Sequence, residues 1–246
     1  MSEVVHDLLG YTGIKIIQRP EMFAFSLDSI LLADFVNIYT KTHRIIDFGT
    51  GNAPIPLFLS LKTNQPILGI EIQPDVADLA KRSVELNGLT HQIDIIQGDI
   101  KELHQLYTPS SFDIVTCNPP FFKVGPDSNI NKSDYLTHAR HEVLITFEDI
   151  LIQAKRMLKN NGELNLVHRA DRLEEIIVML HEHAFSIKRL RFVYPKPGKP
   201  ANAILIEAKN NGSPGSLKLL EPLYVYQADG TYTDAVLKIF RFGKRD

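Results

Sequence analysis

Hydrophobic and polar residues alternate along most of this chain in two rhythms. From residue 43 onward, short runs rich in apolar and β-branched residues are followed by stretches in which apolar residues recur every three or four positions. Strands that alternate with helices in this way are typical of βαβ units and of a parallel sheet. The runs predict strands at 43–48, 67–72, 92–97, 112–117 and 163–168, and helices at 54–62, 74–87, 147–162 and 172–185.

The final part of the chain follows a different pattern. Two β-like runs, at 185–195 and 202–209, have no helix between them and are joined by a segment rich in proline, glycine and lysine. This arrangement predicts an antiparallel pair that closes the sheet. Five β/α units and this pair define an α/β fold: a Rossmann-like, seven-stranded, mostly parallel sheet with a C-terminal antiparallel hairpin and helices on both faces. Such sheets bind ligands beyond the carboxyl ends of their strands.

The residues before this pattern contain one further predicted element. Residues 25–36 have the spacing of an amphipathic helix, with Ser26 as its N-cap and Asp28 in its first turn. No internal repeat and no long linker divides the rest of the chain. We therefore expect a leader with a lid helix at 1–42 and one main domain at 43–246.

Composition limits the classes of protein that remain. The chain has 246 residues, 44% hydrophobic residues and a formal charge of −2, which suits one α/β domain and excludes a polycation of the histone type. The single cysteine, Cys117, cannot form an intrachain disulfide, so a reducing cytoplasm is expected. No apolar run approaches about 18 residues, and the N-terminus lacks a basic segment before an apolar stretch, which argues against membrane spanning and secretion.

Glycines follow the first predicted strand in the sequence DFGTGNAP, residues 47–54. Gly49 and Gly51 allow a tight strand-to-helix turn and the close approach of a ligand to the backbone, and Asp47 precedes them. The third glycine of the dinucleotide pattern is replaced by Pro54, which weakens the case for a nicotinamide cofactor. On its own, a turn of this kind is also compatible with a purely structural role.

Acidic residues end the next two predicted strands. Glu71 lies 20 residues after Gly51, where a carboxylate can accept hydrogen bonds from both ribose hydroxyls. Asp99 follows the third strand, where a carboxylate can accept a hydrogen bond from the exocyclic amine of adenine. Three consecutive strand ends therefore carry groups suited to an adenosine, and none of them requires a phosphate.

The fourth predicted strand ends in Asn118-Pro119-Pro120-Phe121. Two adjacent prolines remove two backbone donors and stiffen the turn, so the loop offers a ligand acceptors and an aromatic face. The Oδ1 atom of Asn118 and the carbonyl of Pro119 can each accept one N–H of a planar amine, while Phe121 stacks on its plane. Cys117 is expected to be a small buried strand residue rather than a nucleophile.

These motifs, in this order, resemble the S-adenosylmethionine-dependent methyltransferases of the seven-stranded class, within the group that methylates amines. The leader at 23–33 (FAFSLDSILLA), the stretch at 139–142 (ARHE) and the tail at 221–226 and 230–233 are further similar to bacterial adenine-N6 methyltransferases that modify a valine tRNA beside its anticodon. The family's loop more often ends in tyrosine, and Phe121 lacks that hydroxyl while keeping the stacking surface.

The resemblance implies a cofactor, a reaction and site residues. S-adenosylmethionine is expected at the Gly49–Gly51 turn, with its ribose on Glu71 and its adenine on Asp99. Asn118, Pro119 and Phe121 are implied as the catalytic set, and Asn118 also borders the cofactor. The remaining cofactor-binding residues implied are Asp47, Phe25, Ser26 and Asp28, the last three closing over the methionine end.

Other acceptors stay open from the sequence. Protein-glutamine methyltransferases use the same loop but carry a helical domain before the glycine turn, where this sequence has 46 residues before Asp47. Guanine-N2 methyltransferases of rRNA have related sequences, whereas DNA-adenine enzymes need a separate recognition domain. A non-catalytic RNA-binding module that kept the cofactor fold is the alternative from another class.

Charge is unevenly distributed, which bears on the substrate. Residues 1–100 hold seven basic and twelve acidic residues, whereas residues 101–246 hold 20 and 17. The densest basic stretch, 186–200, also contains aromatic residues, a combination seen in single-strand RNA contacts. A hairpin edge protected by lysines is the structural alternative. The predicted RNA-binding residues are Lys188, Arg189, Arg191, Lys196 and Lys199.

Two further expectations concern metals and a loop. His181 and His183 lie two positions apart on a predicted helix and cannot share a face, so we expect no metal site. Residues 123–140, polar and glycine-containing, are either a mobile substrate lid or a surface insertion.

Overall fold

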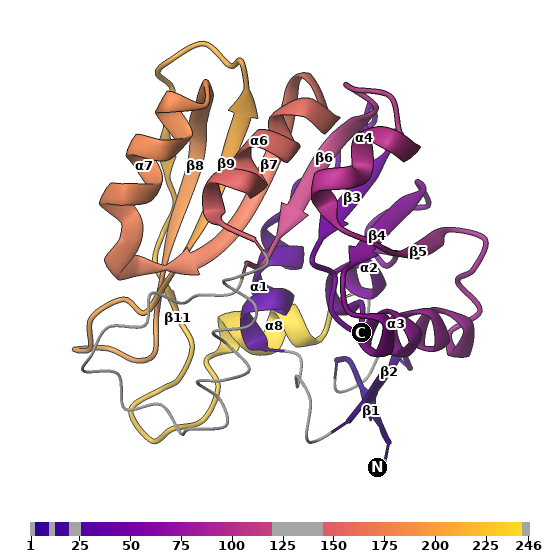
Figure 1. Ribbon diagram of the computed structural model, residues 1–246. Coiled ribbons are helices and arrows are strands. Elements are labelled where there is room, and N and C mark those ends of the chain that lie inside the picture. The colour runs from indigo at the N-terminus through magenta and orange to yellow at the C-terminus, as the bar shows by residue number, and fades with distance from the viewer. Residues whose placement is uncertain (1–2, 10–12, 20–25, 120–144, 243–246) are drawn as a thin grey trace, which may run out of the picture.

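A nine-stranded sheet runs through the computed structural model, which describes residues 3–9, 13–19, 26–119 and 145–242 (Figure 1). Its strands are β3 (Ile45–Phe48), β4 (Ile67–Glu71), β5 (Ile93–Gln97), β6 (Phe112–Cys117), β7 (Leu158–Arg169), β8 (Phe185–Tyr194), β9 (Ala203–Asn210), β10 (Lys218–Leu219) and β11 (Leu223–Tyr224). Their order is β10–β8–β9–β7–β6–β3–β4–β5, with β11 also paired to β8. Strands β3 to β7 are parallel, whereas β9 is antiparallel to both β7 and β8.

Helices cover both faces of the sheet (Figure 1). Alternation along each strand separates the two faces: Ile45 packs toward one helical layer, and Ile46 and Phe48 toward the other. The first layer contains α1 (Leu27–Phe35), α2 (Pro54–Leu59), α3 (Pro74–Leu86) and α8 (Asp234–Phe240). The second contains α4 (Leu103–Leu106), α6 (Phe147–Met157) and α7 (Leu173–Glu182), together with the short helices η1 (Ile100–Glu102) and η2 (Ala170–Arg172).

This architecture confirms the predicted fold class and corrects one helix. Helix α6 ends at Met157, not at the Asn161-Gly162 pair, and β7 begins directly afterwards. The pairing of β6 with β7 is interrupted between Phe112 and Ile114, so Asn161 (φ 60°) and Gly162 form a bulge within the strand. Added to Gly162, a Cβ would lie 2.9 Å from the carbonyl oxygen of Lys159. The pair therefore turns a strand rather than capping a helix.

The C-terminal strands confirm the predicted antiparallel pair but do not end the sheet there. Strand β9 lies between β7 and β8, and the short strands β10 and β11 pair with the outer edge of β8. The sequence pattern did not predict these two strands, because each has only two residues. They bring the C-terminal segment to the carboxyl end of β8, where the amide of Val225 donates to the carbonyl of Tyr194 at 2.8 Å.

The leader packs against the rest of the protein more extensively than the predicted lid helix would require. Before the predicted helix, β1 (Val4–Asp7) and β2 (Lys15–Gln18) form a hairpin that the sequence pattern did not predict. The hairpin is fixed to α3, since the amide of Ile17 donates to the hydroxyl of Ser83 at 3.0 Å. Helix α1 begins at the predicted position, and its apolar side chains belong to the main core. Among the residues that the structure describes, we find no helix that is long and apolar enough to cross a membrane.

Candidate active site

The turn between β3 and α2 is shaped by backbone conformation. Gly49 (φ 64°) and Gly51 (φ 58°) are both left-handed, as is Ala53 (φ 73°) at the N-cap of α2. The turn is tied to the next strand because the amide of Thr50 donates to the carbonyl of Ile70 at 2.9 Å. A Cβ on either glycine would meet no atom within 4 Å. Positive φ therefore requires the glycines, and the space beside their Cα atoms is open to a ligand.

Asp47 supports this turn from below. Its carboxylate is buried and accepts hydrogen bonds from the hydroxyls of Thr50 (2.7 Å) and Thr116 (2.6 Å). Burial raises the pKa of Asp47 to about 7, with a smaller contribution from the nearby charge of Glu71 and partial opposition from the two hydroxyls. Asp47 thus links β3, the glycine turn and β6.

Glu71 lies at the end of β4, as the sequence predicted, and reaches the glycine turn directly. Its Oε2 accepts the amide of Gly51 at 3.0 Å, and its Oε1 accepts the amide of Gln73 at 3.0 Å. The side chain is buried. Each carboxylate oxygen can accept further hydrogen bonds, so Glu71 is both a brace for the turn and an available acceptor.

Asp99 lies after β5 and begins the helix η1. Its Oδ1 accepts the amide of Lys101 at 2.9 Å, and its Oδ2 is 3.7 Å from the ammonium of Lys101. With Glu71 and the glycine turn, Asp99 lies at the carboxyl edge of three adjacent strands. The structure thus brings together the groups that the sequence selected for an adenosine ligand.

Asn118 follows β6 and contacts the leader helix. Its Nδ2 donates to the hydroxyl of Ser29 at 2.9 Å and approaches that of Ser26 at 3.4 Å. The Oδ1 atom is buried and accepts no hydrogen bond from the residues that the structure describes. Pro119 is buried beside it. The contacts fix the orientation of the amide, with its donor satisfied and its acceptor available.

Sequence reasoning missed Ser29. Ser26 and Ser29 are three residues apart, and such residues lie on the same face of a helix, so the leader motif held the signal for a polar face directed at the loop. Ser26 is the N-cap residue of α1 as predicted, but its hydroxyl makes no capping hydrogen bond. Phe25 and Phe121 lie outside the described residues.

A row of polar residues, buried except for the partly exposed Arg189, extends from Asp47 across the sheet. The strand register aligns Asp47, Thr116, Asn165, Glu207 and Arg189 on successive strands. Asp47 and Thr116 are hydrogen-bonded at one end, and Glu207 and Arg189 form an ion pair of 2.5 Å at the other. Both polar side-chain atoms of Asn165, between them, are buried without a partner among the described residues.

The predicted basic stretch separates into two groups. Arg189, predicted to bind RNA, is engaged within the protein: besides its ion pair, it donates to the carbonyl of Phe35 (3.2 Å), and its guanidinium lies 4.3 Å from the ring centroid of Phe35. Lys188 donates to the carbonyls of Ser213 and Gly215. The Nε of Arg191 is buried without a partner among the described residues.

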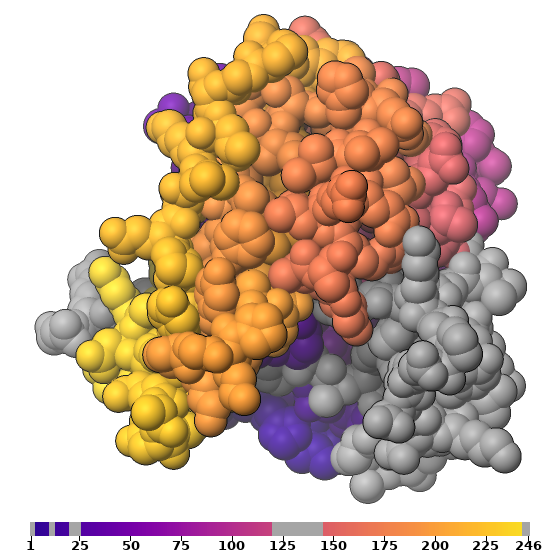
Figure 2. Space-filling view, turned by 90° about the vertical axis from the view of Figure 1, so that its left-hand side faces the viewer, coloured from indigo at the N-terminus to yellow at the C-terminus, as the bar shows by residue number. Residues whose placement is uncertain are grey.

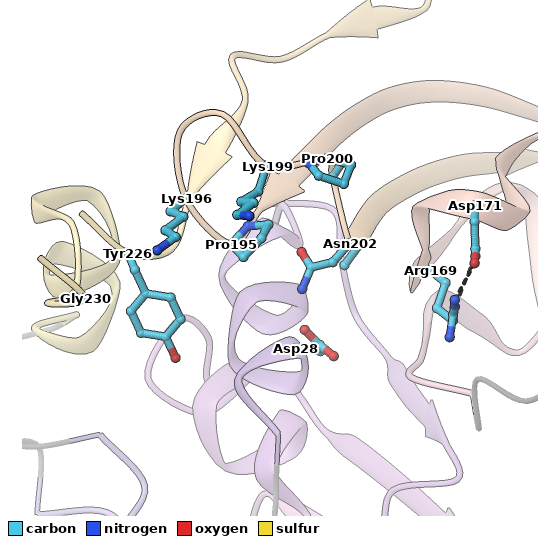
Figure 3. Close-up of a pocket in the computed structure, with 12 residues that line it drawn as sticks. Asp28, Arg169, Asp171, Pro195, Lys196, Lys199, Pro200, Asn202, Tyr226 and Gly230 are labelled. Carbon is cyan, nitrogen blue, oxygen red and sulfur yellow. Dashed lines mark hydrogen bonds and ion pairs between the residues drawn. The ribbon is translucent and has the colours of Figure 1, made fainter. Parts of the chain in front are cut away.

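Lys196 and Lys199 form the second group and are exposed on the β8–β9 turn. They line a pocket of about 1030 Å³ at the carboxyl end of β8. Asp28 of α1, Asn202 and Tyr226 also line it, and Figure 3 shows these side chains around one space. In the space-filling view, the yellow C-terminal segment and the orange β8–β9 segment border a hollow (Figure 2). Indigo atoms from the N-terminal part of the chain lie at its floor.

The other polar candidates have structural environments. Cys117 is buried, as predicted, and burial raises the pKa of its thiol well above the usual value. Burial lowers the pKa of His168 to about 4. In the described part of the chain, no group of three or more histidine, cysteine, aspartate or glutamate residues is placed to hold a metal ion.

Comparison with known proteins places the chain in one family. A family model described as a methyltransferase domain matches residues 40–215. The tRNA1(Val) (adenine(37)-N6)-methyltransferase of Shewanella loihica is 26% identical over 220 residues, covering 87% of this chain and 89% of that relative. The protein of the same name from Porphyromonas gingivalis strain ATCC 33277 is 29% identical over 208 residues, covering 82% and 80%.

Solved structures agree on the fold. A predicted O-methyltransferase of Agrobacterium tumefaciens superposes with a TM-score of 0.66 at 21% identity, covering 88% of this chain and 97% of that one. TrmK of M. capricolum, in complex with the natural cofactor product S-adenosylhomocysteine, gives a TM-score of 0.54 at 19% identity, with coverage of 79% and 72%.

The glycine turn, the two acidic strand ends and this match over most of the chain define a methyltransferase fold. The chain belongs to the methyltransferase-domain family. The resemblance to S-adenosylmethionine-dependent methyltransferases that the motifs predicted is thereby confirmed.

Proposed function

We propose that the protein transfers a methyl group from S-adenosylmethionine to the exocyclic N6 amine of an adenine in RNA, with an adenine next to the anticodon of a valine tRNA as the favoured target. The observation that carries the proposal is the buried Oδ1 of Asn118, an acceptor that no described residue uses. Two curated relatives that match more than four-fifths of this chain bear the name of this activity.

The described residues fit the cofactor. S-adenosylmethionine, when bound, supplies an electrophilic methyl group on a sulfonium. The open side of the Gly49–Gly51 turn offers space at the backbone, and Glu71 beside it offers carboxylate oxygens for ribose hydroxyls. Asp99 is proposed to accept from the adenine. Asp47, which the sequence also assigned to the cofactor, is proposed to act indirectly by holding the turn through Thr50 and Thr116.

The amine of the target base would be held by acceptors at the end of β6. Asn118 Oδ1 and the carbonyl of Pro119 each accept one N–H of the amine, and Phe121 stacks on the base plane. With both hydrogens held, the nitrogen lone pair is directed out of the ring plane toward the methyl group. Ser29 keeps the amide in the required orientation by accepting from Nδ2. The amide is not a base, so the proton released after methyl transfer passes to solvent.

The acceptor side of the site supports an RNA substrate. Exposed lysines on the β8–β9 turn supply the positive charge that phosphates require, and an unstacked adenine can be held between aromatic and polar groups. We place this activity in the cytoplasm, where tRNA is modified and where a lone buried cysteine such as Cys117 stays reduced.

Product analysis tests the proposal and separates it from its alternatives. Purified protein is incubated with methyl-labelled S-adenosylmethionine and small RNA from cells that lack the gene, and the digested nucleosides are identified by mass spectrometry. N6-methyladenosine in the valine tRNA fraction is expected. N2-methylguanosine would indicate a guanine acceptor, label on glutamine of added cell protein would indicate an amide acceptor, and cofactor-independent RNA binding without product would indicate a non-catalytic module.

A further inference from the structure

The pocket beside α1 is a site distinct from the methyl-transfer centre. Neither Asn118 nor Ser29 is among the described residues that line it, whereas Asp28, one position before Ser29, is. Consecutive residues of a helix point about 100° apart, so α1 presents Ser29 to the β6 loop and Asp28 to the pocket. The two sites therefore share the first turn of one helix and lie side by side along the carboxyl edge of the sheet.

One wall of the pocket is an aromatic platform. Tyr226 stacks on Tyr232 with centroids 5.1 Å apart and planes at 24°. Tyr232 and Phe240 form a T-shaped pair with centroids 5.0 Å apart. The amide of Tyr226 donates to the carbonyl of Pro195 at 2.9 Å, which fixes the platform to the β8–β9 turn. The Tyr226 ring points into the space beneath that turn (Figure 3). Its position is set by packing and backbone, so a planar ligand can stack on it without reordering the segment.

The turn above the platform carries positive charge that no described residue neutralises. Lys196 and Lys199 are exposed and form no ion pair with any residue that the structure describes. Arg169, at the far rim, is instead neutralised by Asp171 in a two-point contact through Nε and Nη2. Two free ammonium groups beside an aromatic ring suit a ligand that is planar and also anionic.

The opposite wall of the pocket carries polar groups that can form hydrogen bonds with the edge of a planar ligand. Asp28 has no hydrogen-bond or ion-pair partner in the described part of the chain, and Asn202 points its side chain toward it (Figure 3). Asp28 supplies acceptors only, whereas Asn202 supplies a donor and an acceptor. Burial without a counter-ion raises the pKa of Asp28. A neutral heterocycle with N–H donors on its edge meets these requirements.

We propose that this pocket binds a nucleotide that flanks the target adenine, with its base stacked on Tyr226 and its phosphates beside Lys196 and Lys199. The polar edge of the base meets Asp28 and Asn202, so Asp28 serves the RNA rather than the methionine end of the cofactor. The inference rests on the proposed function, since it assigns the neighbour of the base that Asn118 receives. The pocket then supplies a contact to the RNA loop close to the active site.

A cycle between a protein variant and an RNA variant tests the contact. The probe is a short RNA hairpin with the target adenine in its loop, prepared intact and with an abasic residue in turn at each neighbouring position. We measure KM and kcat for each hairpin with the full-length protein and its Tyr226→Ala variant, and the Kd for S-adenosylhomocysteine. Tyr226→Ala is expected to raise KM for the intact hairpin about tenfold, within the range of one lost base–aromatic stack.

Coupling decides the outcome. One of the two abasic positions should raise KM in the native protein by a similar factor and should have no further effect in the Tyr226→Ala variant. Tyr226→Phe keeps the ring and should change KM less than twofold. Asp28→Asn should raise KM and leave the Kd for S-adenosylhomocysteine unchanged. The matched control is Tyr39→Ala, a tyrosine 44% exposed away from the pocket.

Each alternative result has a distinct meaning. The pocket assignment would be overturned if KM stayed unchanged in Tyr226→Ala, or if the effects of Tyr226→Ala and of both abasic positions on KM simply multiplied. In either case, methylation of the hairpin would still support the proposed function. A weaker Kd for S-adenosylhomocysteine in Asp28→Asn with unchanged KM for RNA would return Asp28 to the cofactor. Absence of methylation of any RNA by the native protein would overturn the proposed function and the pocket assignment with it.

Discussion

The two halves of the sheet's carboxyl edge are built in opposite ways. At β3 and β4, the polar groups are already joined to one another: Glu71 accepts the amide of Gly51, and Asp47 accepts two threonine hydroxyls. At β8 and β9, Asp28 and the turn lysines have no partners among the described residues, and the pocket is open. A small ligand of constant shape is served by a preformed cradle, whereas a large polyanion can meet groups that stay solvated until it arrives.

The largest expected effect comes from the residue between the two halves. Asn118→Ala should lower kcat about 100-fold or more, because the amine loses an acceptor that orients it, while the Kd for S-adenosylhomocysteine stays within about threefold. Methylation kinetics and calorimetry measure the two quantities. Asn37→Ala is the control, because among the described residues the side chain of that asparagine is hydrogen-bonded only to the hydroxyl of Tyr39. Full activity in Asn118→Ala would remove the amine-orienting role.

The next effect should fall on the cofactor half alone. Glu71→Ala removes a buried carboxylate that accepts the amides of Gly51 and Gln73, so the Kd for S-adenosylhomocysteine should rise roughly 10- to 100-fold. Binding of RNA, measured by filter retention, should be unaffected. Glu85→Ala, on the exposed side of α3, is the matched control. A loss of RNA binding equal to the loss of cofactor binding would show that the halves are not independent.

A smaller effect should fall on the acceptor half. Replacing Lys196 and Lys199 together by alanine should weaken RNA binding severalfold and reduce the slope of log K against log salt by between one and two. Lys188→Ala should leave both quantities unchanged, because that ammonium is used by the carbonyls of Ser213 and Gly215. Equal salt slopes for the two variants would contradict the division of the basic stretch.

The smallest expected effect is on the pH dependence of the unfolding free energy, and it concerns Asp47. Its folded pKa of about 7 exceeds the unfolded value near 4, so its contribution to stability is fully present below pH 4 and is lost as pH rises through 7. Asp47→Asn should therefore flatten the decline in unfolding free energy over this window, as followed by urea denaturation. Glu163, whose pKa burial also raises to about 7, should leave a residual slope. Asp75→Asn, on an exposed helix turn, should leave the curve unchanged.

Much of the fold follows from periodicity alone. Strands β3 to β6 and helices α2 and α3 lie where the apolar spacing predicts them, because alternating and helical patterns both bury one face. The short helices η1 and α4 were not predicted. The end of α6 could not be read this way, since Asn161-Gly162 suits a helix terminus and a bulge equally well. The edge strands β10 and β11 are short, and their pairing depends on a neighbour that lies far away in sequence.

The site divides in the same manner. Asp47, Gly51 and Glu71 could be selected from the sequence because each lies at a strand end or a glycine turn, where position and chemistry coincide. The ion pair of Arg189 could not be predicted from the sequence, because its partner Glu207 becomes adjacent only through the pairing of β9 with β8. Tyr226 belongs to the tail motif at 221–226, but its place beside a pocket could not be predicted, because it depends on the backbone contact with Pro195.

The contacts of Lys62 with the leader affect how the protein can be split into two fragments. Its ammonium donates to the carbonyls of Ala33, Asp34 and Val36 at the end of α1, and it follows α2, the helix that begins at the glycine turn. A cut after residue 42 would therefore separate the apolar side chains of α1 from the main core and leave Lys62 without its three acceptors. If residues 26–42 were supplied as a separate peptide, recovery of enzyme activity would report reassembly of the split protein.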